Sequence, residues 1–93
     1  MRQTMFSDAQ NQLKSAEILP GCRYHKGGAV ILRELLKKES ISCIDYGKLD
    51  FVTGRKLLKA NIVAYHPSSG DITFQSTVMK RFCEENSALW ERK

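Results

Sequence analysis

The chain has 93 residues, 42% of them hydrophobic and 27% charged, which is typical of a globular protein with one modest core and excludes a disordered chain. No apolar run approaches the ~20 residues of a membrane-spanning helix, and no long apolar stretch follows Met1, so we predict an intracellular protein, cytoplasmic or nuclear, without a signal peptide. The 15 lysines and arginines exceed the 10 acidic residues, and this net charge of +5 favours nucleic acid, an acidic membrane surface or an acidic protein as a partner without choosing among them.

A first helix is predicted at residues 7–19. Ser7 and Gln10 have the spacing of a capping box, in which the hydroxyl accepts a backbone N–H and the amide reaches back to the cap. A Pro-Gly pair ends this helix, and the glycine-rich residues 21–28 that follow are predicted to form a loop.

The strongest helical pattern follows at residues 29–38, where alanine and leucines recur at helical spacing and define a core-facing stripe. Residues 41–44 favour a short edge strand that pairs with a later hairpin. Residues 45–60 are predicted to be helical, as one helix or as two with a turn near Gly47 or Gly54. Four side chains of this segment are expected to face inward: Phe51, Gly54, Leu57 and Leu58.

A β-hairpin is predicted at residues 61–76, because two runs with alternating side chains flank the turn sequence Pro-Ser-Ser-Gly. Residues 77–93 then return to helix, capped by Ser76 or Thr77. The apolar stripe of this last helix ends at Leu89 and Trp90. We interpret the stripe as core, and the alternative is that Leu89 and Trp90 form a partner or dimer surface.

This order of elements predicts an α+β fold, a winged-helix-like helical domain whose small hairpin is the wing. The competing plain four-helix bundle leaves the hairpin unexplained, and an isolated hairpin is only marginally stable. We expect one domain over residues 1–93, with residues 1–20 as an N-terminal helical extension and residues 27–93 as the winged-helix-like core.

Residues 54–82 resemble the second half of a DEP domain. The sequence Leu-Leu-Lys-Ala-Asn-Ile at residues 57–62 is similar to that family's paired-leucine signature at the end of a helix, and Lys-Arg-Phe at residues 80–82 resembles its terminal aromatic segment. Residues 27–36 resemble the family's first helix. The resemblance implies a non-catalytic signalling module that docks on membranes or receptors and turns basic residues toward acidic headgroups.

A docking module for a protein or an acidic membrane is therefore the first hypothesis for function. Near an acidic membrane each basic residue contributes ~1 kcal/mol of attraction. The candidate basic surface consists of Lys48, Arg55, Lys56, Lys59, Lys80 and Arg81.

Binding of DNA, as in a small transcriptional regulator, is the alternative. Lys48, Arg55 and Lys59 would share the exposed face of the helix before the wing, where Arg55 suits a guanine edge and the lysines suit phosphates. Asp45 and Asp50 oppose this hypothesis because they repel phosphate, and a merely solvated helix face accounts for the three cations equally well. The wing would add three side chains near the adjacent groove or backbone: Tyr65, His66 and Ser68.

No pattern in the sequence indicates catalysis or a metal centre. Cys22 and His25 have the spacing of half a metal site, but a structural zinc needs four ligands, and Cys43, His66 and Cys83 are scattered. Three cysteines also suit a reducing compartment better than a disulfide framework. We predict no enzymatic activity, no catalytic residues, no cofactor and no metal.

Overall fold

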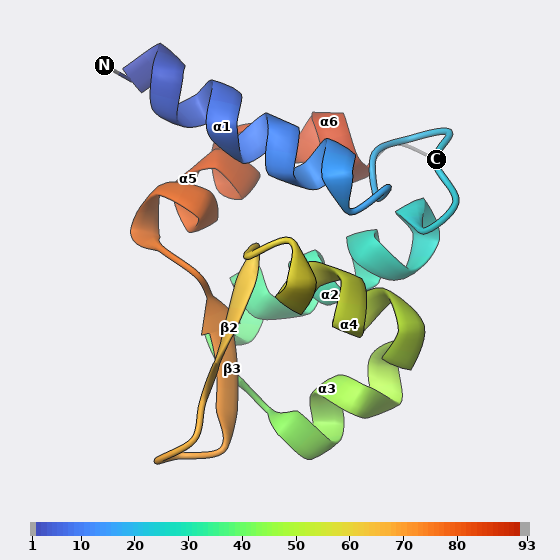
Figure 1. Cartoon of the computed structure of the whole chain (residues 1–93), viewed down its shortest axis with the longest axis vertical. Coiled ribbons are helices and arrows are strands. Elements are labelled where there is room, and N and C mark those ends of the chain that lie inside the picture. Colours follow the sequence, from blue (N-terminus) through green and yellow to red (C-terminus); the bar gives the residue numbers. More distant parts are fainter. Residues whose placement is uncertain (1, 92–93) are drawn as a thin grey trace.

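The computed structural model describes residues 2–91, with side chains from residue 8 onward. These residues form helices and short strands in the order helix, helix, strand, helix, helix, strand, strand, helix, helix (Figure 1). The helices are α1 (Arg2–Ser15), α2 (His25–Lys38), α3 (Cys43–Leu49), α4 (Phe51–Lys59), α5 (Thr77–Glu85) and α6 (Ser87–Glu91), and the strands are β1 (Ile41–Ser42), β2 (Val63–His66) and β3 (Asp71–Phe74).

The three strands form one antiparallel sheet in the order β1-β3-β2. Val63 pairs with Phe74 across the hairpin, and Ile41 of β1 pairs with Ile72 on the other side of β3. The predicted hairpin and its pairing with an upstream edge strand are thus confirmed. β1 is shorter than the predicted residues 41–44, because the Ser42 hydroxyl accepts a hydrogen bond from the Asp45 N–H at 3.2 Å and starts α3 directly after the strand.

The α+β class is confirmed, and the segment α2-β1-α3-α4-β2-β3 has the winged-helix-like order, with the β2–β3 hairpin as the wing. Figure 1 shows this hairpin projecting beside α3 and α4, while α1, α5 and α6 gather at the opposite end of the molecule. Among the described residues no helix is both long and apolar enough to cross a lipid bilayer.

The buried apolar side chains form one cluster to which α1 contributes as well as the later elements. Leu13 of α1 and Ile18 after it are fully buried, as are Ile31 and Leu35 of α2. Burial of one such side chain contributes about 1.5–3 kcal/mol of transfer free energy. The Gln12 side chain also donates to the Ala60 carbonyl at 3.1 Å, which links α1 to the end of α4.

The N-terminal half differs from the sequence prediction at both ends of the first helix and at the start of the second. α1 covers Arg2–Ser15 instead of residues 7–19, so it begins before Ser7, and the side chain of Ser7 lies outside the described residues. α2 begins at His25, inside the segment that was predicted to be a loop. Two glycines of that segment, Gly27 and Gly28, serve close packing, and a Cβ on Gly28 would lie 2.6 Å from the Cβ of Ile18.

The C-terminal segment forms two helices instead of the one predicted for residues 77–93. Ser76 caps α5 by accepting a hydrogen bond from the Met79 N–H at 3.2 Å, which confirms one of the two predicted caps. α5 ends at Glu85, and its C-cap Asn86 donates to the Phe82 carbonyl through both its N–H and its side-chain amide. Residues 92 and 93, included in the predicted helix, lie outside the described part of the chain.

Trp90 on α6 is 0% exposed, so its side chain belongs to the core. Its indole N–H donates to the Cys83 carbonyl at 2.9 Å, and its own carbonyl lies 2.7 Å from Nε2 of His25. The hydrogen bond between His25 and the Trp90 carbonyl joins the start of α2 to α6. The alternative in which Trp90 forms a partner surface is therefore not supported by this fold, and Leu89 beside it is half-buried.

Candidate interaction surface

Asp50 sets the start of α4 and decides which of its side chains reach solvent. Its carboxylate accepts a hydrogen bond from the Thr53 N–H at 3.0 Å, so Asp50 is the N-cap of α4. The predicted helix over residues 45–60 is therefore divided here, and not at Gly47 or Gly54, both of which are helical. Because α4 begins at Phe51, that residue and Val52 occupy its first turn.

Phe51 was expected to face inward, and this expectation is wrong. Phe51 is 64% exposed and Val52 56% exposed, while Thr53, Gly54 and Leu57 form the buried side of α4. The exposed side also carries Arg55 and Lys59. We call the exposed residues Phe51, Val52, Arg55 and Lys59 the α4 face.

Tyr46 of α3 holds the buried side of α4 in place. Its hydroxyl donates to the Gly54 carbonyl at 2.8 Å, and a Cβ on Gly54 would lie 2.7 Å from the tyrosine ring. Glycine is therefore required for this close approach. Burial raises the pKa of the Tyr46 hydroxyl, which keeps it protonated as a donor.

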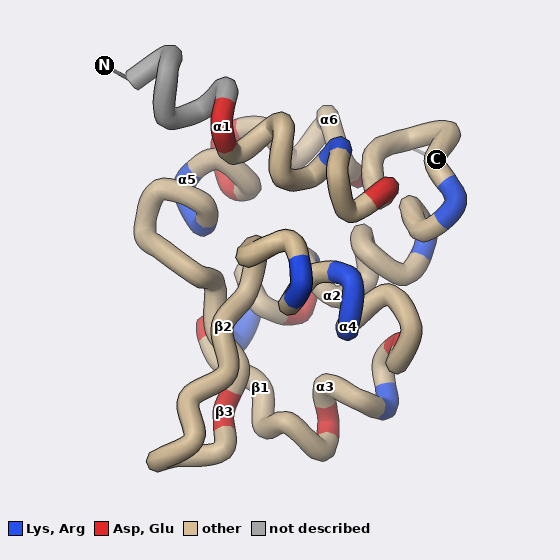
Figure 2. The backbone as a smooth tube through the Cα atoms, in the orientation of Figure 1, with Lys and Arg blue, Asp and Glu red and all other residues tan. Residues whose placement is uncertain are grey.

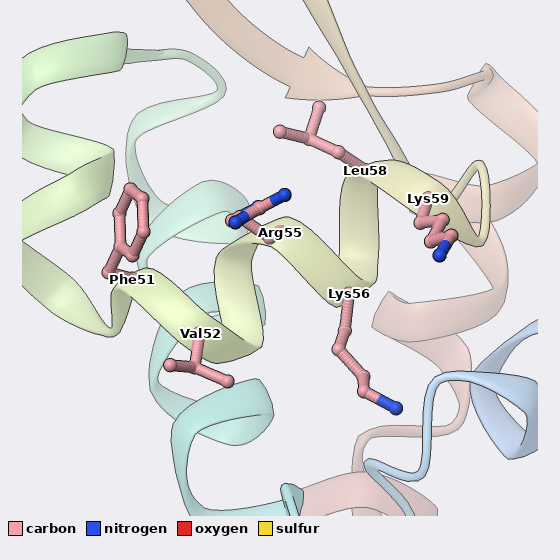
Figure 3. A pocket seen from close by; sticks show the side chains of 6 residues that line it. All are labelled: Phe51, Val52, Arg55, Lys56, Leu58 and Lys59. Carbon is pink, nitrogen blue, oxygen red and sulfur yellow. The ribbon is translucent and has the colours of Figure 1, made fainter.

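A groove of about 560 Å³ runs along α4 between its exposed side chains (Figure 3). Its lining consists of Phe51, Val52, Arg55, Lys56, Leu58 and Lys59. We call it the α4 groove. Figure 3 shows Val52 and Lys56 on one side of the helix and Leu58 on the side nearer the sheet, with the Arg55 side chain between Phe51 and Leu58. The Arg55 guanidinium carbon lies 5.9 Å from the centroid of the Phe51 ring.

A second, smaller depression of about 180 Å³ lies where α3, α4 and the wing meet. We call it the wing hollow. Its lining is mostly apolar and comes from Cys43, Tyr46, Gly47, Phe51, Arg55, Leu58, Tyr65 and Ile72. Tyr65 is 48% exposed and pairs with Ile72 in the hairpin, so it forms the wing side of the hollow. Phe51, Arg55 and Leu58 line both depressions, which are therefore contiguous.

The predicted basic residues do not form one surface. Lys48 belongs to α3, because the helix is divided at Asp50, so it does not continue the row of Arg55 and Lys59 on α4. Lys80 and Arg81 lie on α5 and pair with Glu39 and Glu85, with N–O separations of 3.4 and 3.9 Å. In Figure 2, α4 is a basic stretch, and acidic segments mark the neighbouring α3 and β3.

The cations of α4 differ in their surroundings. Lys56 pairs with Glu17 at 3.1 Å and lies 4.8 Å from the centroid of the Tyr24 ring, so it is engaged with the chain that follows α1. Arg55 and Lys59 have no carboxylate within ion-pair distance among residues 8–91. These two are the basic residues of the candidate set that α4 exposes to solvent without such a pairing.

The remaining residues predicted on the wing are exposed. His66 lies at the end of β2, where its Nε2 is 2.8 Å from the Thr73 hydroxyl. Ser68 lies in the turn between β2 and β3. Neither side chain lines the α4 groove or the wing hollow, so Tyr65 is the wing residue that the fold brings to the α4 face.

The groups with chemical reactivity are dispersed or buried. Burial, with a smaller effect of the neighbouring Glu84 carboxylate, raises the pKa of the Cys83 thiol to about 12, so this thiol is not a nucleophile at neutral pH. Both histidines are engaged in the hydrogen bonds given above. Within the described part of the chain, no group of three or more His, Cys, Asp or Glu side chains is placed to hold a metal ion.

Two exposed apolar residues of α3 and α4 are not predicted from the sequence: Val52, and Ile44 at the start of α3, which is 69% exposed. A signal for both was present. Ser42 precedes Ile44, and Asp50 precedes Phe51 and Val52, and either side chain is a preferred N-cap. Recognising both caps would have placed helix starts at Cys43 and Phe51, as observed.

The chain matches no known protein-family model, and a search of curated proteins likewise finds no match.

Proposed function

We propose that this chain is a non-catalytic interaction module that binds a protein partner through the α4 face and the adjoining wing. The observation that carries this proposal is the presence of large exposed apolar side chains next to exposed cations. Phe51, Val52 and Tyr65 are about half exposed or more, and Phe51 and Tyr65 line a common hollow. Contiguous exposed apolar surface is typical of interaction sites, and aromatic residues and arginine are enriched in protein interfaces.

The first turn of α4 favours a protein partner over DNA. In helices that read the major groove, the N-terminal residues contact base edges and form hydrogen bonds with them. Here those positions hold Phe51 and Val52, which offer no side-chain donor, directly after the Asp50 carboxylate. Two further carboxylates, Asp45 and Asp71, lie on the neighbouring α3 and β3 and repel phosphate.

The resemblance of residues 54–82 to a DEP domain also supports a docking role. That family docks on membranes or receptors, and the residues of the paired-leucine signature are Leu57, which is buried, and Leu58, which lines the α4 groove. A protein partner accounts for the mixed apolar and basic surface better than a lipid surface does, because a membrane is held by several basic residues together and α4 presents only two unpaired ones.

DNA binding remains the second candidate because one observation favours it. Arg55 and Lys59 are exposed on the helix that precedes the wing, which is the helix that a winged-helix protein inserts into the major groove. Their cationic groups suit phosphate or a guanine edge.

Site-specific photo-crosslinking in cells that express the protein tests the proposal. A photoreactive phenylalanine analogue is placed at Val52 on the α4 face, and a matched control carries it at Val30, an exposed apolar residue on α2. We expect a discrete protein adduct from position 52, weaker when Lys59→Glu is added, and none from position 30. Equal adducts from both positions, or adducts with nucleic acid alone, would contradict the proposal.

A further inference from the structure

We propose that the docking segment of the partner is acidic and carries one bulky apolar side chain, which enters the wing hollow while its carboxylates pair with Arg55 and Lys59. This inference rests on the proposed function and specifies the chemistry of the partner at that same surface.

The size of the wing hollow points to a single side chain as its occupant. Sites for small molecules and cofactors occupy ~300–1,000 Å³, and the hollow has about 180 Å³. Its walls are chiefly the rings of Tyr46, Phe51 and Tyr65 and the aliphatic side chains of Leu58 and Ile72. An aromatic or leucine side chain buries its apolar surface against such walls without leaving a polar atom unpaired, as anchor residues in protein interfaces do.

The charge around the hollow points to carboxylates on the same segment. The linings of the hollow and of the adjoining α4 groove contain cations and no aspartate or glutamate. Arg55 lines both depressions, and Lys59 lines the groove one helical turn further along α4. Lys56, Lys80 and Arg81 of the candidate set already pair with carboxylates of this chain, and Lys48 lies on α3 and lines neither depression.

The same charges disfavour a second copy of this chain as the occupant. The chain carries a net charge of +5, and a two-fold contact through α4 would place Arg55 and Lys59 of each copy near those of the other. Like charges brought together in this way oppose association. An acidic segment gains attraction from the same arrangement, and that attraction decreases with salt.

A random peptide library displayed on phage, panned against the full chain, tests the inference. We expect enriched peptides that combine Asp or Glu with one aromatic residue or leucine. The affinity of the consensus peptide is then measured for the double variant Arg55→Gln, Lys59→Gln and for a charge-matched control, Lys14→Gln, Lys37→Gln. Both control residues are exposed and lie outside the groove and the hollow. All variants are first checked for wild-type melting temperature.

The expected result is about tenfold weaker binding by the α4 double variant, since two exposed ion pairs are lost, and less than ~twofold change in the control. Apolar consensus peptides without acidic residues, bound equally by both double variants but lost on Tyr65→Ala, would overturn the acidic partner and leave protein docking at this surface intact. Failure to enrich any peptide, or binding that neither Tyr65→Ala nor the α4 double variant alters, would overturn the inference and the proposed function together.

Discussion

Replacing Trp90 with alanine is expected to remove a large part of the stability of the fold. The indole is fully buried and donates to the Cys83 carbonyl at 2.9 Å. Truncation of a buried tryptophan costs ~3–5 kcal/mol, and the lost hydrogen bond leaves a buried carbonyl without this donor. A domain of 93 residues has an unfolding free energy of ~5–14 kcal/mol, so the substitution removes a third or more of a mid-range value. The corresponding fall in melting temperature is ~15–30 °C.

Far-ultraviolet circular dichroism during urea unfolding is the suitable assay, because Trp90 is the single tryptophan and its removal eliminates tryptophan fluorescence. Two controls accompany it. Trp90→Phe keeps most of the apolar surface but loses the N–H donor and part of the ring, so a smaller cost of ~1–3 kcal/mol is expected. Leu89→Ala removes a half-buried side chain and is expected to cost ~1 kcal/mol.

The assignment of Trp90 to the core would be refuted by a Trp90→Ala variant whose unfolding free energy lies within ~0.5 kcal/mol of the wild type. Measurement at two protein concentrations separates stability from association. If only the concentrated wild type were more stable than the variant, α6 would be a partner surface after all.

Further predictions concern two glycines and two cysteines. Gly54→Ala is expected to destabilise the fold by ~1–3 kcal/mol in chemical denaturation, because its Cβ would meet the Tyr46 ring at 2.7 Å. Gly47→Ala, with nothing within 4 Å of its Cβ, should instead stabilise the fold by ~0.5–1 kcal/mol. A stabilising Gly54→Ala would contradict the packing of α4 on α3. In a thiol-reactivity assay on the native protein, the exposed Cys43 should react promptly and the buried Cys83 only on unfolding, and equal rates would show that Cys83 is accessible. Burial raises the pKa of Cys83 from 9.0 to about 12, so the unfolded chain loses this proton first and stability should fall as pH rises from about 9 to 12. The slope should be smaller in Cys83→Ala, and an unchanged slope would assign the effect to another group.

The wing was predictable because its signals are local. A turn sequence between two runs of alternating side chains specifies a hairpin without reference to the rest of the fold. The pairing of residues 41–42 with β3 followed from the same reasoning, since a short β-favouring segment needs a partner strand. Together, the hairpin and the short strand made the winged-helix-like order predictable.

The candidate surface was less predictable because it depends on one helix boundary. Asp50 lies in a run whose apolar periodicity predicts a continuous helix, and this periodicity does not reveal its role as an N-cap. In the helix that begins at Phe51, Phe51 and Val52 are turned to solvent. The ion pairs of Lys56 and Lys80 join segments far apart in the chain, so no local pattern reveals them. The hydrogen bond between His25 and the Trp90 carbonyl likewise joins segments far apart in the chain.

Binding of the purified chain to random duplex DNA and to acidic vesicles, each across a salt titration, tests most directly whether the α4 face is a protein-docking surface. If the α4 face docks a protein, we expect weak binding to both at low salt. This binding should change equally in the double variant Arg55→Gln, Lys59→Gln and in the charge-matched Lys14→Gln, Lys37→Gln, because only net charge is involved. DNA affinity that falls steeply with salt and is reduced by the α4 double variant alone would contradict it and establish α4 as a nucleic-acid-binding helix. Vesicle binding with that same dependence on Arg55 and Lys59 would contradict it in favour of a membrane-docking module.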